Sequence, residues 1–425
     1  MNLFFQLITI LLPLYLLSTY QLSQTALAQS ASKEIPTAAP EDVGMSSTKL
    51  HQVNEIMQGY VDDGKLVGGI VIVARKGKIC FFEDYGLADR ENNRAMSKDS
   101  ILRFYSMTKS ITTAAALMLH DQGKLHFNDP VSKYIPELAD AQIVTEDGLR
   151  PAENTMTIAD LMRHTSGLTY GESKNKAHNL LHEKHEPTSP DITLSEMPAR
   201  LKEVQLAFEP STAWSYGISI DVLGRVIEVA SGKSLEEFFN ERLIGPLDMR
   251  DTGFHVPAEK LSRFAACYEP TDDGFKIREN EHEKYLQSPA FKSGGGGLVS
   301  TARDYIRFLM MIQNGGQLDG RRYLKPETVT LMTTNQTPAE AGWVQFGDEV
   351  REGVGFGFGF NVRDKMSAWD PAGRVGEYGW GGAASTHYWV SPKDDLIVIT
   401  LEQIRPYRWL TEFGLKKVIY EAIEK

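Results

Sequence analysis

The chain has 425 residues, of which 42% are hydrophobic, and its formal net charge at pH 7 is −11. This size allows a large buried core, and the acidic balance without a long Lys/Arg run argues against nucleic acid or anionic membranes as partners. Two cysteines, Cys80 and Cys267, are too few for a disulfide framework. They could pair in an oxidising compartment, or Cys80 could stay a free buried thiol in a strand, so both alternatives remain open.

The first 28 residues have the features of a signal peptide. Leu3 to Leu17 is almost continuously apolar but shorter than the roughly 20 residues of a membrane-spanning helix, and Ala26-Leu-Ala28 is a cleavage-site pattern. The start carries no Lys or Arg, which keeps an uncleaved anchor as the alternative. We expect a secreted or periplasmic protein cleaved after Ala28, with residues 29–40 as a flexible linker and no membrane span after processing.

The elements expected in chain order place strands at both ends of the chain and helices in the middle. Periodicity predicts a helix over 45–60, a β-hairpin over 68–85, helices beginning near Ser106, Thr157 and Asp221, a helix over 305–313, strands over 353–362, 383–390 and 396–402, and a helix over 409–424. Capping boxes are expected at Thr157-Ile-Ala-Asp160 and Thr301-Ala-Arg-Asp304.

This order predicts an α+β fold for a single domain over residues 41–425. An antiparallel sheet with flanking helices would form from about 41–95 and 295–425, and a helical lobe from about 96–294. We expect the active site in the cleft between sheet and lobe.

A serine three residues before a lysine opens the first helix of the lobe, at Ser106 and Lys109. The same S-x-x-K spacing occurs at Ser30, Ser46 and Ser173, but those segments are polar and cannot desolvate an amine. Residues 111–119 are apolar on nearly every face, which indicates a buried helix.

Burial predicts a lowered pKa for Lys109, which could then accept or relay a proton from Ser106 one helical turn away. Backbone N–H groups of the first turn would stabilise negative charge at Ser106. The alternative is a serine N-cap with a lysine that extends to solvent.

Five ordered blocks resemble the serine β-lactamase-like superfamily, which includes class C β-lactamases, D-alanyl-D-alanine peptidases and family VIII carboxylesterases. The blocks are Phe104-Tyr-Ser-Met-Thr-Lys109, Leu161-Met-Arg-His-Thr-Ser-Gly-Leu168, the segment Trp214 to Gly224, Gly294-Gly-Gly-Gly-Leu-Val-Ser-Thr301 and Trp380-Gly-Gly382. The likeness extends from Met45 to the C-terminus. It implies a β-lactamase/transpeptidase-like fold and an acyl-enzyme on Ser106, with Lys109 and a tyrosine handling protons.

The resemblance assigns that tyrosine to Tyr216. The usual Y-x-N pattern is replaced by Tyr216-Gly-Ile218, and an apolar residue at position 218 is familiar in the esterase branch. Ile218 would then contact the substrate. A phenol can act as a base if a nearby ammonium stabilises its phenolate, which Lys109 could provide.

The resemblance places an oxyanion hole at the backbone N–H groups of Ser106 and Ala383. Trp380, Gly381 and Gly382 precede a predicted strand and would bind the substrate, with the glycines allowing close approach. A competing K-S-G triplet begins at Lys292, but a four-glycine run and no strand follows it.

Other candidate sites carry weaker signals. His178, His182 and His185 could share a helix face and bind zinc, yet their charged, Pro-flanked segment reads as a surface loop or lid. His164 and Ser166 suggest a triad, but no G-x-S-x-G elbow supports one.

We therefore expect a serine hydrolase that cleaves small carboxylic esters and needs no metal or cofactor. The alternatives are a β-lactamase or D-alanyl-D-alanine peptidase, and a penicillin-binding receptor that acylates without turnover. The physiological substrate, the acyl length and the oligomeric state stay open.

Overall fold

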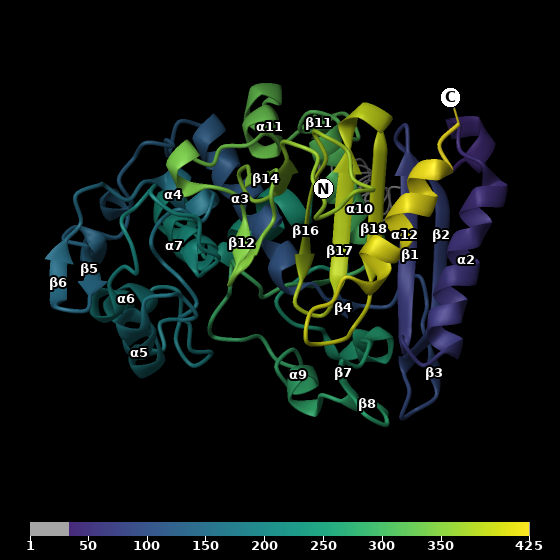
Figure 1. Ribbon diagram of the computed structural model, residues 1–425, viewed down its shortest axis with the longest axis horizontal. Coiled ribbons are helices and arrows are strands. Elements are labelled where there is room, and N and C mark those ends of the chain that lie inside the picture. Colours follow the sequence, from purple (N-terminus) through teal and green to yellow (C-terminus); the bar gives the residue numbers. More distant parts are fainter. Residues whose placement is uncertain (1–33, 425) are drawn as a thin grey trace, which may run out of the picture. The chain divides into compact units, whose positions relative to one another are not determined.

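An eight-stranded antiparallel sheet is the centre of the computed structural model, which describes residues 34–424 (Figure 1). Its strand order is β14-β15-β16-β17-β18-β1-β2-β3. The bounds are β14 Val354–Phe356, β15 Asn361–Arg363, β16 Tyr378–Gly382, β17 Thr386–Ser391, β18 Leu396–Leu401, β1 Gly68–Arg75, β2 Lys78–Asp89 and β3 Arg94–Ala95. Ile72 of β1 lies opposite Ile399 of β18, so both ends of the chain build one sheet, as predicted.

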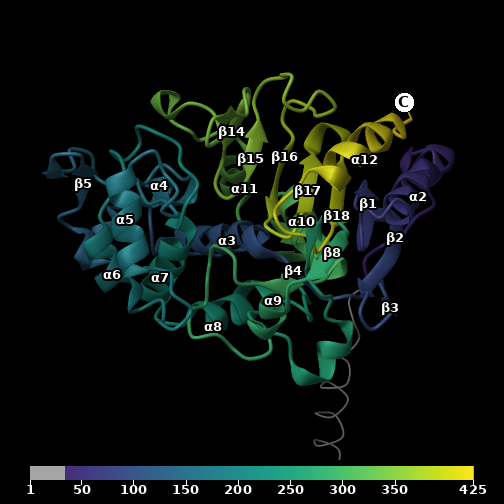
Figure 2. The ribbon, with the colours of Figure 1, turned by 60° about the horizontal axis from the view of Figure 1, so that its bottom comes forward.

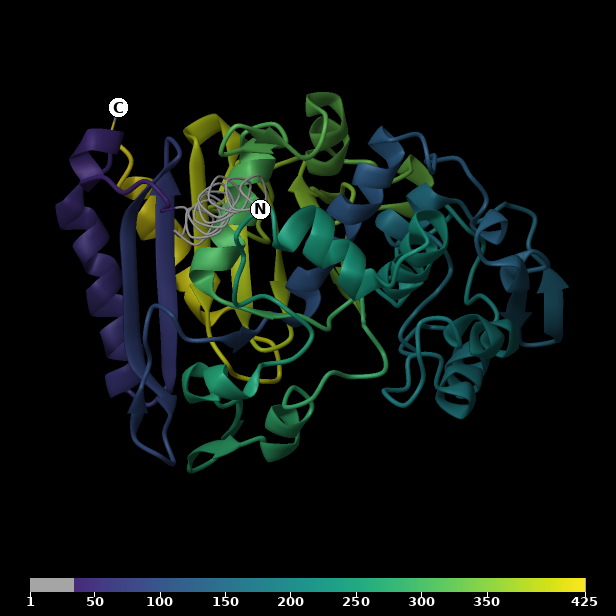
Figure 3. The ribbon, with the colours of Figure 1, turned by 180° about the vertical axis from the view of Figure 1, so that it is seen from behind.

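Helices cover both faces of the sheet. On one face α2 (Ser47–Asp62) and α12 (Leu410–Glu421) pack together over apolar residues such as Val71 and Val398 (Figure 1). On the other face lies α10 (Ala302–Gln313), seen in green across the yellow strands in Figure 3. The Tyr305 hydroxyl of α10 donates to the Met107 carbonyl at 2.9 Å, which ties this layer to the candidate nucleophile segment.

The helical lobe begins with α3 (Thr108–Asp121), which runs from the sheet into the lobe in Figure 2. The lobe contains α4 Ile158–Met162, α5 Lys176–His185, α6 Met197–Val204, α7 Ser219–Ser231, α8 Leu235–Phe239 and the hairpin of β5 Gln142–Thr145 with β6 Gly148–Pro151. The capping box at Thr157 is present, so the predicted start of the second helix is confirmed.

Short elements connect the lobe to the last strands of the sheet. They are β4 Leu102–Arg103 paired with β9 Val299–Ser300, β7 Tyr268–Thr271 paired with β8 Gly274–Ile277, α9 Glu279–Glu283, β10 Gln317–Leu318 paired with β11 Arg321–Arg322, α11 Pro326–Thr333, and β12 Gln345–Phe346 paired with β13 Glu349–Val350.

Three local predictions were wrong. Residues 353–362 form the hairpin β14–β15 and not one strand, because Gly359 adopts a φ of +85° at the turn. The predicted 383–390 strand begins at Thr386, and Trp380-Gly-Gly382 belongs to the separate strand β16. Thr301 caps α10 by accepting from the Asp304 N–H, but the Asp304 carboxylate binds Thr252 and the Asp251 N–H, so no reciprocal box forms.

The prediction of a flexible linker over residues 29–40 is wrong for its last residues, which the structure describes. Ala38 donates to the Ile79 carbonyl at 2.9 Å and Ile79 donates to the Pro36 carbonyl at 2.8 Å, so residues 36–40 lie along β2. The predicted leader, residues 1–28, lies outside the described residues. Within 34–424, no helix combines the length and apolarity needed to cross a membrane. Cys80 and Cys267 are both free and buried, so they do not form a disulfide with each other.

Candidate active site

Ser106 lies where the sheet region passes into the lobe. It stands in a single 3-10 turn, Tyr105–Met107, that continues directly into α3. The Ser106 side chain is partly exposed, whereas every residue from Thr108 to Leu119 is buried. The core therefore fixes the helix while its first turn presents the serine hydroxyl to solvent.

Lys109 is fully buried beside this hydroxyl. Its Nζ donates to the Gly295 carbonyl at 2.6 Å, to the Tyr170 hydroxyl at 3.0 Å and to the Ser106 Oγ at 3.3 Å. It also lies 4.6 Å from the ring centroid of Tyr216. The predicted Ser106–Lys109 contact is present, and the alternative of a solvent-extended lysine is wrong.

The predicted pKa of Lys109 was wrong in direction. Burial lowers the pKa of Lys109, but Tyr170, Tyr216 and Asp221 together outweigh burial and raise it. Asp221 is itself buried, and it accepts from the Ser293 hydroxyl at 2.6 Å and from the Gly295 N–H at 2.9 Å. The lysine is therefore held as an ammonium, because loops distant in sequence surround it with oxygen atoms.

Two tyrosines face this ammonium, and the sequence identified one of them. Tyr216 is packed among aromatic rings and accepts from the Trp380 Nε1–H at 3.4 Å. Tyr170, whose ring lies 5.5 Å from that of Tyr216, makes the direct hydrogen bond to Lys109. Tyr170 follows the block 161–168 by two residues, and this adjacency was the available signal for it.

A left-handed residue precedes the nucleophile. Tyr105 has a φ of +43°, a conformation that costs a bulky residue about 1–2 kcal/mol. Its hydroxyl donates to Glu281 at 2.6 Å, and Arg405 donates to the same carboxylate at 2.7 Å. Burial raises the pKa of Glu281, but the Tyr105 hydrogen bond, Lys284 and Arg405 outweigh it and lower the pKa. A buried, ionised carboxylate thus holds the turn that carries Ser106.

The end of β16 lies against this turn. A Cβ at Gly382 would collide with the Phe104 carbonyl oxygen, and one at Gly381 would lie 2.7 Å from the Tyr407 hydroxyl, so both positions require glycine. Ala383 follows in the turn to β17 and lines the same cavity as Ser106. The turn after β16 thus lies against the segment that carries Ser106, while the oxyanion hole at the N–H groups of Ser106 and Ala383 stays a prediction.

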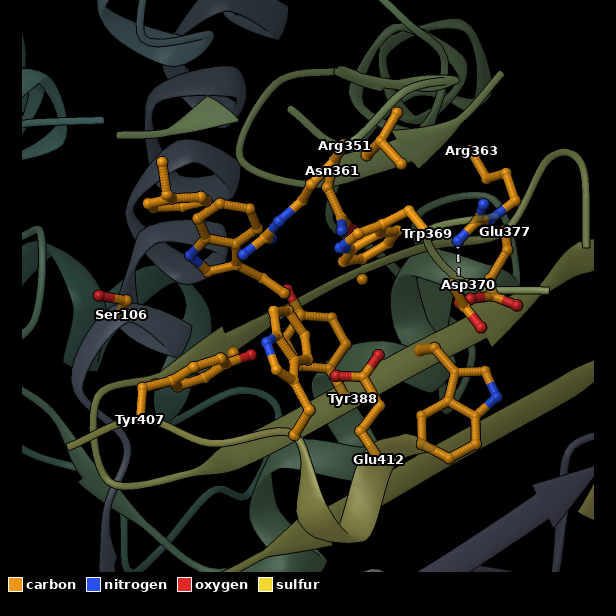
Figure 4. Close-up of a pocket in the computed structure, with 18 of the residues that line it drawn as sticks. Ser106, Arg351, Asn361, Arg363, Trp369, Asp370, Glu377, Tyr388, Tyr407 and Glu412 are labelled. Carbon is orange, nitrogen blue, oxygen red and sulfur yellow. Dashed lines mark hydrogen bonds and ion pairs between the residues drawn. The ribbon is translucent and has the colours of Figure 1, made fainter. Parts of the chain in front are cut away.

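A cavity of about 390 Å³ extends from Ser106 along β16. Figure 4 shows Ser106 at one side of it and Asp370 and Glu377 at the other. The predicted substrate residues Trp380, Gly381 and Gly382 line it, together with Tyr216. Ile218 does not: its side chain is 1% exposed at the start of α7, so the expectation of direct substrate contact was wrong.

The competing serine and histidine sites are explained as structural. Ser166 is buried and shares a hydrogen bond of 2.8 Å with Ser219, so it is not available as a nucleophile. His164 is fully buried among rings, with its pKa lowered by burial and then by Lys109, and neither of its ring nitrogens has a hydrogen-bond partner within residues 34–424. Neutral and unbonded, His164 takes no part in a proton chain.

The remaining two candidates also have other roles. Lys292 forms an ion pair with Glu236 at 3.0 Å in a loop, so the triplet that it begins is not a strand motif. His178 and His182 lie on α5, which corrects the predicted loop, and His178 is buried. Among residues 34–424 no group of three or more His, Cys, Asp or Glu side chains is arranged to hold a metal ion.

Known proteins resemble this chain over most of its length. A family model described as Beta-lactamase matches residues 53–408. "Protein Rv1367c" of Mycobacterium tuberculosis (strain ATCC 25618 / H37Rv) is 34% identical over 356 residues, which cover 81% of this chain and 88% of the relative. "Esterase EstB" of Burkholderia gladioli is 32% identical over 387 residues, covering 86% and 92%. The solved structure of "EstCE1, a hydrolase with promiscuous acyltransferase activity" has a TM-score of 0.73 at 25% identity, covering 88% and 98%.

Proposed function

This chain belongs to the β-lactamase family and is a serine hydrolase, and from that premise we propose that it cleaves carboxylic esters through a covalent acyl-enzyme on Ser106. The observation that carries the proposal is the contact of the buried Lys109 ammonium with the Ser106 Oγ at 3.3 Å, at the mouth of a partly apolar cavity. One relative is named an esterase, EstB, which supports esters as the substrate class.

In the first half-reaction Tyr216 acts as a phenolate that the Lys109 ammonium stabilises. Ser106 Oγ attacks the ester carbonyl while its proton passes to this phenolate oxygen. The resulting oxyanion is stabilised by the N–H groups of Ser106 and Ala383, where each such donor contributes about 2.7–4 kcal/mol. The tetrahedral intermediate collapses as the C–O bond to the alcohol breaks, and Tyr216 returns the proton to the leaving oxygen.

In the second half-reaction water replaces the serine as nucleophile. Tyr216 removes a proton from the water, the tetrahedral intermediate collapses, and the proton returns to Ser106 as the acid leaves. Lys109 keeps its proton and stabilises negative charge on Ser106 and Tyr216 in both halves. No metal or organic cofactor is needed in this scheme.

Esters are favoured over amides by the residues near Tyr216. Where related hydrolases of amide-bearing drugs carry an asparagine, this chain has the buried Ile218, and Trp380 takes the place of a lysine on β16. Trp380 therefore leaves the cavity wall without an ammonium at its position, and Ile218, buried beneath the wall, supplies no amide to it.

A parallel assay with a short-chain nitrophenyl ester and a chromogenic cephalosporin tests the proposal. We expect ester turnover that Ser106→Ala abolishes, and a mass shift on Ser106 after labelling with a serine-directed phosphonate. Fast cephalosporin turnover with negligible ester cleavage would instead identify a β-lactamase. A stable penicillin adduct with no turnover of either substrate would identify a receptor, and phosphonate labelling elsewhere would refute the nucleophile.

We further propose that the protein is exported and cleaved after Ala28. Sequencing of the mature N-terminus from secreted or periplasmic material tests this, and an intact Met1 in an otherwise membrane-bound protein would refute it.

A further inference from the structure

The active-site cavity contains a buried arginine in addition to the residues proposed for catalysis. Arg351 follows the β12–β13 hairpin and is 6% exposed, yet it lines the cavity that reaches Ser106. Figure 4 shows Arg351 between Ser106 and Arg363, with Trp369 beside it. A cation in this place contacts whatever part of the substrate extends beyond the reacting ester.

Aromatic rings surround the Arg351 guanidinium. Its Cζ lies 4.3 Å from the ring centroid of Phe346, 4.6 Å from that of Trp409 and 4.9 Å from that of Trp369. These rings displace water from the charge, which strengthens any hydrogen bond that the guanidinium makes.

The hydrogen-bonding capacity of Arg351 is largely unused. Its Nε donates to Glu349 at 3.3 Å, and the Glu349 side chain is 51% exposed. Within residues 34–424 neither terminal nitrogen of Arg351 has a hydrogen-bond acceptor. A planar guanidinium with two free terminal nitrogens is the group that binds a carboxylate in a bidentate manner.

The other charges of the cavity already have partners. Lys416 donates to Asp370 and Glu377 at 2.7 Å each and to Glu412 at 3.3 Å. Arg363 donates to Asp370 at 2.8 Å. Lys416 and Arg363 thus bind carboxylates buried in the wall, whereas Arg351 has one ion pair, to the half-exposed Glu349 at 3.3 Å. The terminal nitrogens of Arg351 can therefore turn to a ligand.

We infer that Arg351 binds a carboxylate of the substrate, so that the preferred substrates are esters with a free acid group beyond the scissile bond. Monoesters of dicarboxylic acids have this chemistry: the ester carbonyl lies at Ser106, the apolar chain lies along the aromatic wall, and the acid reaches Arg351. The inference rests on the proposed esterase activity, because it assigns the substrate of that same site.

Matched substrate pairs test the inference. The acid-bearing member is the mono-nitrophenyl ester of a dicarboxylic acid, and its partners are the equal-length nitrophenyl ester of a monoacid and the methyl-capped diester. Over a series of chain lengths, the wild-type kcat/KM for the acid-bearing ester should exceed that of its neutral partners by about 10- to 100-fold at the best length.

Two variants connect the preference to one side chain. Arg351→Met keeps an apolar side chain among the rings and should reduce the ratio of acid-bearing to neutral kcat/KM to about 1 or below. Arg321→Met is the matched control: Arg321 also contacts an aromatic ring, that of Tyr323 at 5.2 Å, but it is exposed outside the cavity. This control should keep the wild-type ratio.

Binding provides a readout that is independent of turnover. By calorimetry, Ser106→Ala should bind the acid-bearing ester more tightly than its methyl-capped partner, and the added Arg351→Met should remove the difference. Equal wild-type kcat/KM for both members at every length, or a preference that survives Arg351→Met, would overturn the inference while the esterase proposal stands. An absence of any ester cleavage would instead refute the proposed function.

Discussion

The two tyrosines at Lys109 have different contacts, which predicts different losses when each is changed to phenylalanine. Tyr170→Phe removes the 3.0 Å hydrogen bond from the Lys109 ammonium. A hydrogen bond to a charged group contributes about 1.5–3 kcal/mol, which corresponds to about a 10- to 150-fold loss in kcat/KM if it is fully used in the transition state. Tyr216→Phe removes the group proposed to carry the proton, and general acid–base catalysis contributes about 10²- to 10⁴-fold.

The assay is kcat/KM with a short-chain nitrophenyl ester, measured over pH for wild type and both variants. Tyr216→Phe should lower kcat/KM more than Tyr170→Phe across the whole pH range, because it removes the proposed proton carrier and not a positioning hydrogen bond. Tyr134→Phe is the matched control: it removes another buried tyrosine hydroxyl, bonded to Asp129 at 2.6 Å, away from the cavity. A larger loss for Tyr170→Phe than for Tyr216→Phe would refute the assignment and make Tyr170 the proton carrier.

The remaining predictions concern buried charges. Lys416→Met leaves three buried carboxylates without their shared cation and should lower the free energy of unfolding by about 3–5 kcal/mol in a urea titration, while a loss below about 1 kcal/mol would contradict this. Burial raises the pKa of Glu412, but Lys416 and His387 outweigh it and lower the pKa from 4.5 to about 2. The pKa of Glu412 is thus lower in the folded protein than in the unfolded chain. The ionised Glu412 therefore stabilises the folded state by about 3 kcal/mol at pH values above the unfolded pKa, and this stabilisation is lost as the pH falls toward about 2. The free energy of unfolding of Glu412→Gln should lack this loss at acidic pH. The same loss in the variant as in the wild type would contradict the assignment to Glu412. Glu281→Gln weakens the hold on Tyr105 and should lower kcat about 10-fold with little change in KM; a change confined to KM would argue against a positioning role.

The parts of the fold that follow from local pattern were predictable. Short apolar runs bounded by turn residues identified β1, β2 and β18, and the buried run after Ser106 identified α3. The errors arose where a tertiary contact determines the backbone. Gly359 packs against Thr113 of α3, and this contact, invisible in the sequence, turns a glycine-rich segment into the hairpin β14–β15.

The residues of the candidate site likewise divide into those that local sequence predicts and those that only tertiary contacts bring together. Ser106 and Lys109 are neighbours on one turn, so their spacing was sufficient to predict the contact. Gly295 and Tyr170 reach Lys109, and Arg351 reaches the cavity, from segments far apart in the chain, and their residue types carry no local signal of these roles. The reversed pKa direction of Lys109 has the same cause, because burial could be foreseen from α3 whereas the compensating oxygen atoms could not.

The charge on Lys109 determines which group can accept the serine proton. A neutral amine could take the proton itself, but an ammonium has no lone pair to accept it. This ammonium lies 3.3 Å from the Ser106 oxygen and 4.6 Å from the Tyr216 ring, so one buried cation stabilises negative charge on the nucleophile and on its base. Its position is fixed by the Gly295 carbonyl and the Tyr170 hydroxyl, two acceptors that hold the charge without removing it. In the mechanism proposed above, the Lys109 cation therefore preorganises the site electrostatically, and tyrosine carries the mobile proton.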